Sequence, residues 1–510
     1  EMTSSLVGSE MCIRDSYKTM LDKQQQAAIG FAYIIENLQT CSPFGEELAR
    51  HTHAYPCEEN ARLCRELENV RLLAETVRSD AAREALSAAE RALMQLKDVR
   101  CSVARSREMT LTDVEFFEIK RFLIKLDALA EAFSKIPCGE RLNEIDIHPL
   151  PRALSIVDPD GMRAMTFRVS DSASAELAKI RRERKRVDAE LRRDPVEGRD
   201  ALEAERTLLA AREESEELRI RTEMTRAFAA YSNEAEQVIK SIARFDFALA
   251  KARLMCSRGG SIPKVYANGQ RVLLNEMINP QTADALHSSG RKFTPVSIEL
   301  LSGSTVITGA NMGGKSVAVK TLALNVLLAL CGFPVFCREA ELPHFAGIHL
   351  LCEDMEDSLG GLSSFGGEMI RFDGILSEIK TESTALVLLD EFARGTNPHE
   401  GAALVRAAVK YFNNRRGCFA LITTHFDDVA CCAPTHYQVI GLKNVEPAVL
   451  DAALAGNDAS RASVLPKLMD YGLYRVASDV NPPRDALAIC RAMRVSDEFM
   501  RCVNAEETKQ

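Results

Sequence analysis

The sequence predicts a multidomain α plus α/β protein, in which an all-helical region precedes an α/β domain. From about residue 17 to 255 the chain holds few glycines and long segments rich in Leu, Ala, Glu and Arg, as helices do. Further along, the apolar runs 306–307, 385–389 and 418–424 are typical of buried parallel strands. A glycine turn and a helix-like segment follow the first of these runs, which favours an α/β arrangement.

The composition fits a protein with ample buried core and no membrane-spanning segment. The chain has 510 residues, of which 46% are hydrophobic and 27% charged, enough for about two or three domains. No apolar run approaches the roughly 20 residues of a membrane span. The 15 cysteines are scattered along the chain, which favours reduced thiols over a disulfide framework. We therefore expect a soluble cytoplasmic protein without membrane association.

Residues 1–16 are not expected to belong to the fold. They lack the basic start and the apolar stretch of a secretory signal. Residues 5–16 resemble a translated sequencing-adapter tail of the kind seen on assembled gene fragments. We therefore expect a non-native tail at 1–16, a fold that begins at about residue 17, and a true N-terminus that is missing or altered.

A helical core and lever is expected over residues 17–290. Within it, Thr112 and Glu115 have the spacing of a capping box that opens a helix. Apolar residues then recur at helical spacing and predict one buried face. The predicted face consists of Phe116, Ile119, Leu123, Leu126, Ala130 and Phe133.

Residues 174–235 predict a short antiparallel coiled-coil arm. A highly charged helix ends at a turn signal in residues 194–198, and a second charged helix follows. The first helix contains the basic run 181–186, which could contact phosphates or form a solvated helix face. Its acidic neighbours favour the solvated face.

Residues 309–316 have the spacing of a phosphate-binding loop, G-x-x-x-x-G-K-S, with a strand before it and a helix after it. Backbone N–H groups of such a loop converge on an anion, while Lys315 reaches the β- and γ-phosphates and the Ser316 hydroxyl binds Mg²⁺. The loop therefore predicts a nucleoside triphosphate site. Its predicted contacts are Gly309, Asn311, Met312, Gly313, Gly314, Lys315, Ser316 and Val317.

The two later apolar runs end in residues suited to phosphate chemistry. Asp390 and Glu391 close the run 385–389, and the carboxyl end of a buried parallel strand faces the crevice of an α/β sheet. Asp390 is predicted to hold Mg²⁺ and Glu391 to polarise the attacking water, so we expect hydrolysis with Lys315 and Glu391 as catalytic residues. His425 closes the third run, either as a packed strand-end residue or as a hydrogen-bond donor to the γ-phosphate. Order and spacing favour the second role, so His425 is predicted as a third catalytic residue.

Motifs in this order resemble those of the MutS family of ABC-class ATPases. The matching segments are the phosphate loop 309–316, the signature segment 363–369, the Asp-Glu segment 390–396 and the Thr-His switch 424–425. The resemblance is good over about 290–510, where residues 469–472 are similar to a tail that closes the domain. It implies a P-loop ATPase domain at 291–450 that binds ATP and Mg²⁺, a helical lever and clamp before it, and a helical closing and dimerisation segment at 451–510.

The resemblance also implies a dimer. In ABC-class ATPases the signature segment presents a serine and a helix N-terminus to the γ-phosphate of the other subunit, and Ser364, Gly366 and Gly367 stand at those positions. A glycine-rich turn that merely starts a helix is the alternative. Gly366 replaces the family's methionine, and Ala310 replaces a proline in the phosphate loop. We expect a homodimer that ATP fastens and hydrolysis releases, with Phe293 on the adenine base.

Two classes of client are possible for this ATPase, DNA and another protein. In the first, a MutS-like dimer without its own mismatch-reading domain closes its arms around DNA. The net charge of −9 offers no global attraction to nucleic acid, although acidic proteins can carry local basic grooves. In the second, the Asp-Glu-Phe-Ala-Arg-Gly-Thr-Asn-Pro pattern and the short arm resemble MutS-related subunits that, with a companion reactivase subunit, reactivate cobalamin-dependent lysine or ornithine aminomutases. A structural, non-hydrolysing role is weakest, because Lys315 and Glu391 are both present.

Overall fold

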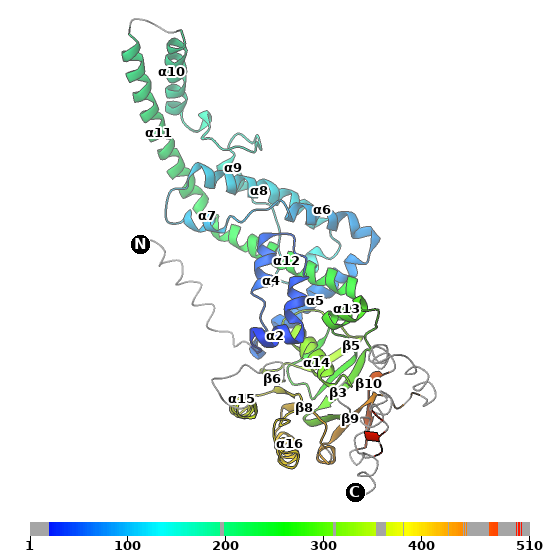
Figure 1. The fold of residues 1–510 in the computed structure, drawn as a ribbon. Helices are drawn as coiled ribbons and strands as arrows, with labels where there is room; N and C mark the ends of the chain where they lie inside the picture. Colours follow the sequence, from blue (N-terminus) through cyan, green and yellow to red (C-terminus); the bar gives the residue numbers. More distant parts are fainter. Residues whose placement is uncertain are drawn as a thin grey trace. The chain divides into compact units, whose positions relative to one another are not determined.

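The computed structural model divides the chain into two compact units (Figure 1). It describes residues 20–193, 198–309, 313–352, 364–380, 382–426, 428–441 and 469–477, with single positions at 443, 445, 496, 498, 499 and 501. The first unit comprises Glu1–Leu38, Thr52–Arg71 and Lys251–Gln510, and the second comprises Gln39–His51 and Leu72–Ala250. Among the described residues, no helix combines the length and the apolar character that crossing a bilayer requires.

The described part of the second unit is helical. Its helices are α4 (Pro43–Arg50), α6 (Arg83–Leu93), α7 (Arg100–Arg105), α8 (Asp113–Ser134), α9 (Pro151–Val157), α10 (Ala175–Leu191) and α11 (Arg199–Ala229), and it shares α5 (Asn60–Val77) and α12 (Ser232–Arg258) with the first unit. The predicted capping box opens α8: Thr112 Oγ1 accepts from the Glu115 N–H at 3.3 Å, and Glu115 Oε2 accepts from the Thr112 N–H at 2.8 Å. All six apolar residues of the predicted face are buried. The sequence prediction for this helix is therefore confirmed.

Helices α10 and α11 lie side by side as an antiparallel pair (Figure 1). Two small apolar clusters join them, one with Leu177 and Ile220 and the other with Val187 and Leu209. The turn residues 194–197 lie outside the described part of the chain. Because these clusters are small, apolar burial between the two helices is limited.

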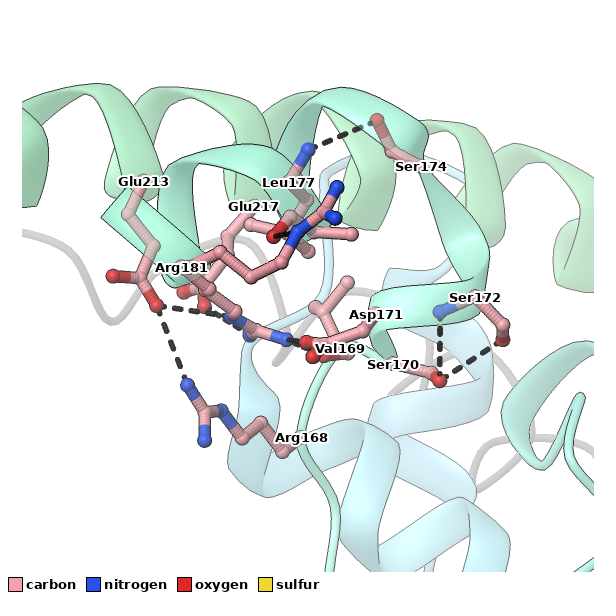
Figure 2. A network of polar contacts seen from close by, with 12 residues as sticks. Arg168, Val169, Ser170, Asp171, Ser172, Ser174, Leu177, Arg181, Glu213 and Glu217 are labelled. Atoms are coloured by element: carbon pink, nitrogen blue, oxygen red, sulfur yellow. Dashed lines mark hydrogen bonds and ion pairs between the residues drawn. The ribbon is translucent and has the colours of Figure 1, made fainter. Parts of the chain in front are cut away.

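The basic run 181–186 on α10 was expected to be solvated, but its first residue, Arg181, is buried. Arg181 is 5% exposed, and its guanidinium contacts the carboxylates of Asp171, Glu213 and Glu217 (Figure 2). Its Nε lies 3.0 Å from Glu213 Oε1, its Nη2 lies 2.6 Å from Glu217 Oε1, and its Nη1 donates to the Val169 carbonyl at 2.7 Å. These partners compensate the desolvation of the buried cation. Arg181 is therefore a structural residue and not a solvated one.

The first unit holds a six-stranded sheet among its described residues. Its strands are β4 (Gly303–Thr308), β6 (Gly347–Leu351), β7 (Ala385–Leu389), β8 (Cys418–Thr424), β9 (Thr435–Gly441) and β10 (Asp470–Val476). Their order is β10-β9-β4-β8-β7-β6, and every pair is parallel except β10 with β9. The three apolar runs predicted as strands form β4, β7 and β8, which are buried along their whole length. Such burial on both faces explains their uninterrupted apolar sequence.

Helices cover this sheet. The helices of the first unit are α2 (Lys23–Ile29), α3 (Phe31–Glu36), α13 (Pro280–Ser288), α14 (Lys315–Leu330), α15 (Ser364–Glu378) and α16 (Pro398–Asn413), in addition to its parts of α5 and α12. Side chains of α15 and α16 pack with β7 and β8 in one apolar core. Helix α14 directly follows the phosphate loop, and nearly all of its residues are buried. The loop is therefore anchored to the core on both sides.

A second sheet lies partly in the segment 17–290, which the sequence analysis expected to be helical. Its order is β1-β5-β2-β3, with β1 (Lys264–Tyr266), β2 (Arg271–Met277), β3 (Val296–Leu301) and β5 (Glu339–Pro343). In β2 the residues Val272 and Leu274 are buried, whereas Arg271 before them and Leu273 between them are not fully buried. This alternation has the period of a strand, not of a helix, which is why residues 264–277 depart from the expectation.

The expected helical segment 451–510 contributes a strand, β10, and most of its other residues lie outside the described part of the chain. Strand β10 pairs antiparallel with β9, with Tyr474 opposite Gln438 and Val476 opposite His436. Without it, β9 would present a row of unpaired backbone groups at the edge of the sheet. Completing this edge is a long-range requirement that the local sequence of the segment does not reveal.

Candidate active site

The predicted site residues follow three neighbouring parallel strands. Gly309 follows β4, Asp390 follows β7 and His425 follows β8, and the order β4-β8-β7 places these strands side by side. The carboxyl ends of parallel strands meet at one edge of a sheet, where open α/β sheets bind ligands. Residues separated by more than a hundred positions in the sequence are thus brought to one crevice.

Two glycines shape the described ends of the phosphate loop. Gly309 has a φ of +150° and Gly314 a φ of +83°, backbone conformations that strain other residues. A Cβ added at Gly309 would lie 3.0 Å from the Cβ of Val439, and one added at Gly314 would lie 3.0 Å from the Cδ1 of Tyr471. Both the backbone and the neighbouring side chains therefore require glycine at these positions.

Lys315 and Ser316 begin α14 and face the end of the sheet. Lys315 is 3% exposed, and its Nζ donates to the Gly309 carbonyl at 2.8 Å. The Ser316 hydroxyl hydrogen-bonds the Asp390 carboxyl. A hydroxyl and a carboxylate side by side are oxygen ligands of the kind that Mg²⁺ prefers, so these residues fit the ion. Of the other predicted loop contacts, two line the adjoining cavity, Gly313 and Val317, and two lie outside the described residues, Asn311 and Met312.

Asp390 is held in a buried hydrogen-bonded frame. Its exposed fraction is 6%. The Thr423 hydroxyl donates to Asp390 Oδ1 at 2.7 Å and accepts from the Glu391 N–H at 2.9 Å. Burial raises the pKa of Asp390 above its ordinary 3.8, and the hydrogen bonds from Thr423 and Ser316 oppose that shift. A cation beside this carboxyl would favour its ionised form.

Glu391 lies between two cationic side chains. Its Oε1 is 3.3 Å from Lys315 Nζ, and its Oε2 is 3.1 Å from Arg394 Nη1. The backbone φ is +51° at Glu391 and +61° at Ala393, a region that costs a non-glycine residue about 1–3 kcal/mol. The chain therefore stores strain in the turn that places this carboxylate beside the phosphate loop.

His425 belongs to the same electrostatic environment. It reaches the surface of the unit, and its ring centroid lies 4.6 Å from that of Phe426. Partial desolvation lowers the pKa of His425 below 6.5, while the negative charge of Glu391 opposes the shift. The imidazole is thus close enough to Glu391 to sense its charge, and its contact with a γ-phosphate stays a prediction.

A cavity of about 650 Å³ adjoins the loop, a volume in the usual range for small-ligand pockets. Phe293, the residue expected at the base, lines it. Other lining residues, for which the sequence predicted no ligand contact, include Leu286, Arg291, Lys292, Met469 and Tyr471. The similarity of residues 469–472 to a tail that closes the domain was the sequence feature that could have indicated Met469 and Tyr471 here. Only the pairing of β10 with β9 brings Tyr471 against Gly314.

Helix α15 begins at Ser364, the first of the predicted signature residues, and Gly366 and Gly367 lie in its first turn. Glu368, the residue after Gly367, accepts a hydrogen bond from the Ala393 N–H at 3.1 Å. This bond ties the start of α15 to the strained turn that follows the Asp-Glu pair. The Ser364 side chain lies outside the described part of the chain, and its contact with a second subunit stays a prediction.

The phosphate loop and the residues at the ends of β7 and β8 lie within one matched domain. Residues 305–487 match MutS domain V. MutS domain V is an ATPase domain, and the match includes Lys315, Asp390, Glu391 and His425. It starts within β4 and extends past β10, so it spans the six-stranded sheet and the crevice at its edge.

Relatives point to the same family. The chain is 33% identical over 203 residues to a DNA mismatch repair protein MSH3 of Candida glabrata, covering 39% of this chain and 19% of the relative. It is 31% identical over 232 residues to an Endonuclease MutS2 of Thermotoga petrophila, covering 45% and 29%, and 36% identical over 186 residues to that of Solidesulfovibrio magneticus, covering 36% and 23%. These similarities support membership of the MutS family. The chain spans less than a third of the length of each of these relatives.

Proposed function

We propose that this chain is a Mg²⁺-dependent ATPase of the MutS type that acts on DNA as a homodimer. The observation that carries the proposal is the meeting of Lys315, Asp390 and Glu391 at one loop. Lys315 Nζ lies 3.3 Å from Glu391 Oε1, and the Ser316 hydroxyl forms a hydrogen bond with the Asp390 carboxyl. Transfer of a γ-phosphoryl group to water requires a phosphate-binding cation, a metal ligand set and a group that positions the water.

Each residue has a defined part in this reaction. Lys315 binds the β- and γ-phosphates, and Ser316 and Asp390 would hold the Mg²⁺ that neutralises phosphate charge. Glu391 orients a water molecule and accepts its proton as the water oxygen bonds to the γ-phosphorus. The bond from that phosphorus to the bridging oxygen breaks, which leaves ADP and inorganic phosphate. His425 hydrogen-bonds the γ-phosphate and loses this partner on product release.

The dimer follows from the role proposed for α15. Ser364, Gly366 and Gly367 would face the γ-phosphate bound by the second subunit, where a helix N-terminus stabilises negative charge. The hydrogen bond from Ala393 to Glu368 supports coupling, because it joins α15 to the turn that carries Glu391. ATP would thereby hold two subunits together until hydrolysis, and a local phosphate event becomes a large movement.

DNA is the proposed client. The relatives described above are named as a DNA mismatch repair protein and as endonucleases, and they lend no support to an aminomutase client or to a companion reactivase subunit. Exposed basic residues of α10 and its C-terminal end offer a local positive surface: Lys179, Arg182, Lys185, Arg186, Arg192 and Arg193. Arg181 is not part of this surface, because it is buried.

Two substitutions test the ATPase proposal. Lys315→Ala is expected to abolish binding of a fluorescent ATP analogue, because the loop loses its buried cation. Glu391→Gln is expected to bind the analogue nearly as wild type does while steady-state hydrolysis falls by about 10²–10⁴-fold, since the water loses its base. Lys410→Ala and Glu400→Gln, on the exposed side of α16, are matched controls and should behave as wild type. Wild-type turnover in Glu391→Gln would refute its role.

A further inference from the structure

The geometry points to a second metal site in the first unit, suited to a divalent transition-metal ion, with His349 and Glu378 as its ligands and Glu382 as the carboxylate that orients the His349 ring. His349 lies on β6, Glu378 ends α15, and Glu382 lies in the segment that leads into β7. One ligand atom from each residue lies within 4.8 Å of the other two. None of the three belongs to the ATPase site described above, so this inference does not depend on the proposed function.

The orientation of the His349 ring suits metal binding. Its Nε2 lies 2.8 Å from Glu382 Oε2, and its Nδ1 lies 3.7 Å from Glu378 Oε2. A neutral imidazole carries one N–H, so donation from Nε2 to Glu382 leaves a lone pair on Nδ1 directed at Glu378. This is the carboxylate–histidine arrangement that fixes the ring of a metal ligand.

The distance between His349 Nδ1 and Glu378 Oε2 is close to the distance between two ligand atoms of one metal ion. Two ligand atoms held about 2.1 Å from one Zn²⁺ at an angle of roughly 110–120° are about 3.4–3.6 Å apart. The observed 3.7 Å between His349 Nδ1 and Glu378 Oε2 needs only a small adjustment to match this spacing. The same gap is long for a direct hydrogen bond.

Burial and backbone shape show that the cluster is built into the fold. The His349 and Glu382 side chains are 7% and 6% exposed. A Cβ added at Gly347 would lie 2.3 Å from Glu382 Oε1. A larger residue at this position of β6 would therefore collide with the Glu382 carboxylate. Glu378 is 51% exposed, which opens one side of the cluster to solvent and leaves room for water ligands.

The donor set selects the class of metal. Imidazole nitrogen with carboxylate oxygens suits Mn²⁺, Co²⁺ and Zn²⁺, whereas Mg²⁺ and Ca²⁺ take oxygen ligands. A bound ion would connect β6 to the C-terminal end of α15, the helix that begins at Ser364. The site would thereby fix the end of the helix whose other end is the proposed signature segment.

The test uses Mn²⁺ and the full-length chain without nucleotide, with Mg²⁺ in large excess so that sites made only of oxygen ligands are filled. Pulsed electron paramagnetic resonance should show about one bound Mn²⁺ per chain with coupling to an imidazole nitrogen. His349→Gln should lose this coupling and weaken Mn²⁺ binding by at least about tenfold, in line with losses at metal sites. His399→Gln, at an exposed position of α16, is the matched control and should retain both.

A second variant separates loss of the site from loss of folding. Glu378 is half-exposed, so Glu378→Gln should leave the metal-free melting temperature unchanged and remove the rise that Mn²⁺ produces in wild type. Absence of nitrogen coupling in wild type would overturn the proposal and leave the cluster as a polar contact between β6 and the end of α15. Coupling that persists in His349→Gln would overturn it as well, because the ion would then sit elsewhere.

Discussion

Buried polar side chains surround the residues that would contact phosphate. Thr308, the last residue of β4, is fully buried, and its hydroxyl lies 2.8 Å from Nε2 of His436 on β9. His436 is 1% exposed, and burial lowers its pKa below 6.5. A neutral imidazole is therefore part of the support of the phosphate loop, one residue before Gly309.

His436 should make the stability of the first unit depend on pH. Because its pKa is lowered in the folded state, the unfolded chain binds the proton more readily. This contribution to stability is complete above the unfolded-state pKa of about 6.5 and is lost as the pH falls through the folded-state value. Urea unfolding at a series of pH values between about 7 and 5 measures the slope.

Substitutions show which histidines cause this dependence of the unfolding free energy on pH. His436→Gln keeps a polar partner for Thr308 and is expected to reduce the slope, while buried His344, whose pKa burial also lowers, maintains part of it. His399→Gln changes an exposed histidine and should leave the slope as in wild type. A slope in His436→Gln equal to that of wild type would show that this histidine does not titrate with unfolding.

Among the structural elements, the α10–α11 pair has a buried charge network beside its small apolar clusters. The apolar clusters between the helices are small, and one buried guanidinium joins α10 to α11 and to the segment before α10. Glu213 accepts from Arg181 and from Arg184 and is itself 7% exposed. A buried ion pair gives little net stability, but removing one partner leaves an uncompensated charge.

Arg181→Ala is therefore expected to loosen the arm by about 3 kcal/mol. Amide hydrogen exchange in α10 and α11 measures this, and about 3 kcal/mol corresponds to an increase in exchange rate of roughly a hundredfold. Arg182→Ala removes the neighbouring exposed cation and is expected to change protection by less than about threefold, in keeping with surface substitutions. Equal protection in both variants would contradict the structural role of Arg181.

For the whole molecule, the proposal requires that nucleotide state controls assembly. Glu391→Gln binds ATP without hydrolysing it, so ATP and Mg²⁺ are expected to convert this variant to a dimer in sedimentation velocity. ADP should leave it a monomer, because the γ-phosphate that joins the subunits is missing. Lys315→Ala should remain a monomer with either nucleotide. A wild-type chain that hydrolyses ATP at full rate as a monomer would rule out the contribution of Ser364 from a partner.

DNA binding tests the client. Binding of duplex DNA by wild type is expected to fall steeply with salt, and Arg182→Gln, Lys185→Gln and Arg186→Gln together should lower the log–log slope by about three, if each contacts one phosphate. The matched control removes the same charge from exposed positions of the second unit outside the arm, and should keep the wild-type slope. The control substitutions are Arg50→Gln, Arg83→Gln and Lys135→Gln. Equal slopes would exclude this surface of α10 as the DNA contact.

Local sequence patterns were sufficient where a function depends on a short segment. The phosphate-loop spacing predicted a strand before the loop and a helix after it, and β4 and α14 stand there, because glycine turns and helix N-termini are local properties. The Thr112 capping box and the buried face of α8 were predicted for the same reason. The strands β1 and β2 were missed, because their period-two pattern is short and adjoins a long helical region.

The sequence alone predicted the chemistry that we propose for this chain, since a cation, a hydroxyl and two carboxylates in fixed order indicate phosphate and Mg²⁺ before any fold is known. Tertiary structure alone decided which distant side chains meet. Pairing of β10 with β9 brings Tyr471 to the loop, and the meeting of β6 with the end of α15 brings His349 to Glu378. Burial of Arg181 was likewise decided by α11. The physical reason is that strand pairing and desolvation depend on partners far away in the chain, which a local pattern cannot specify.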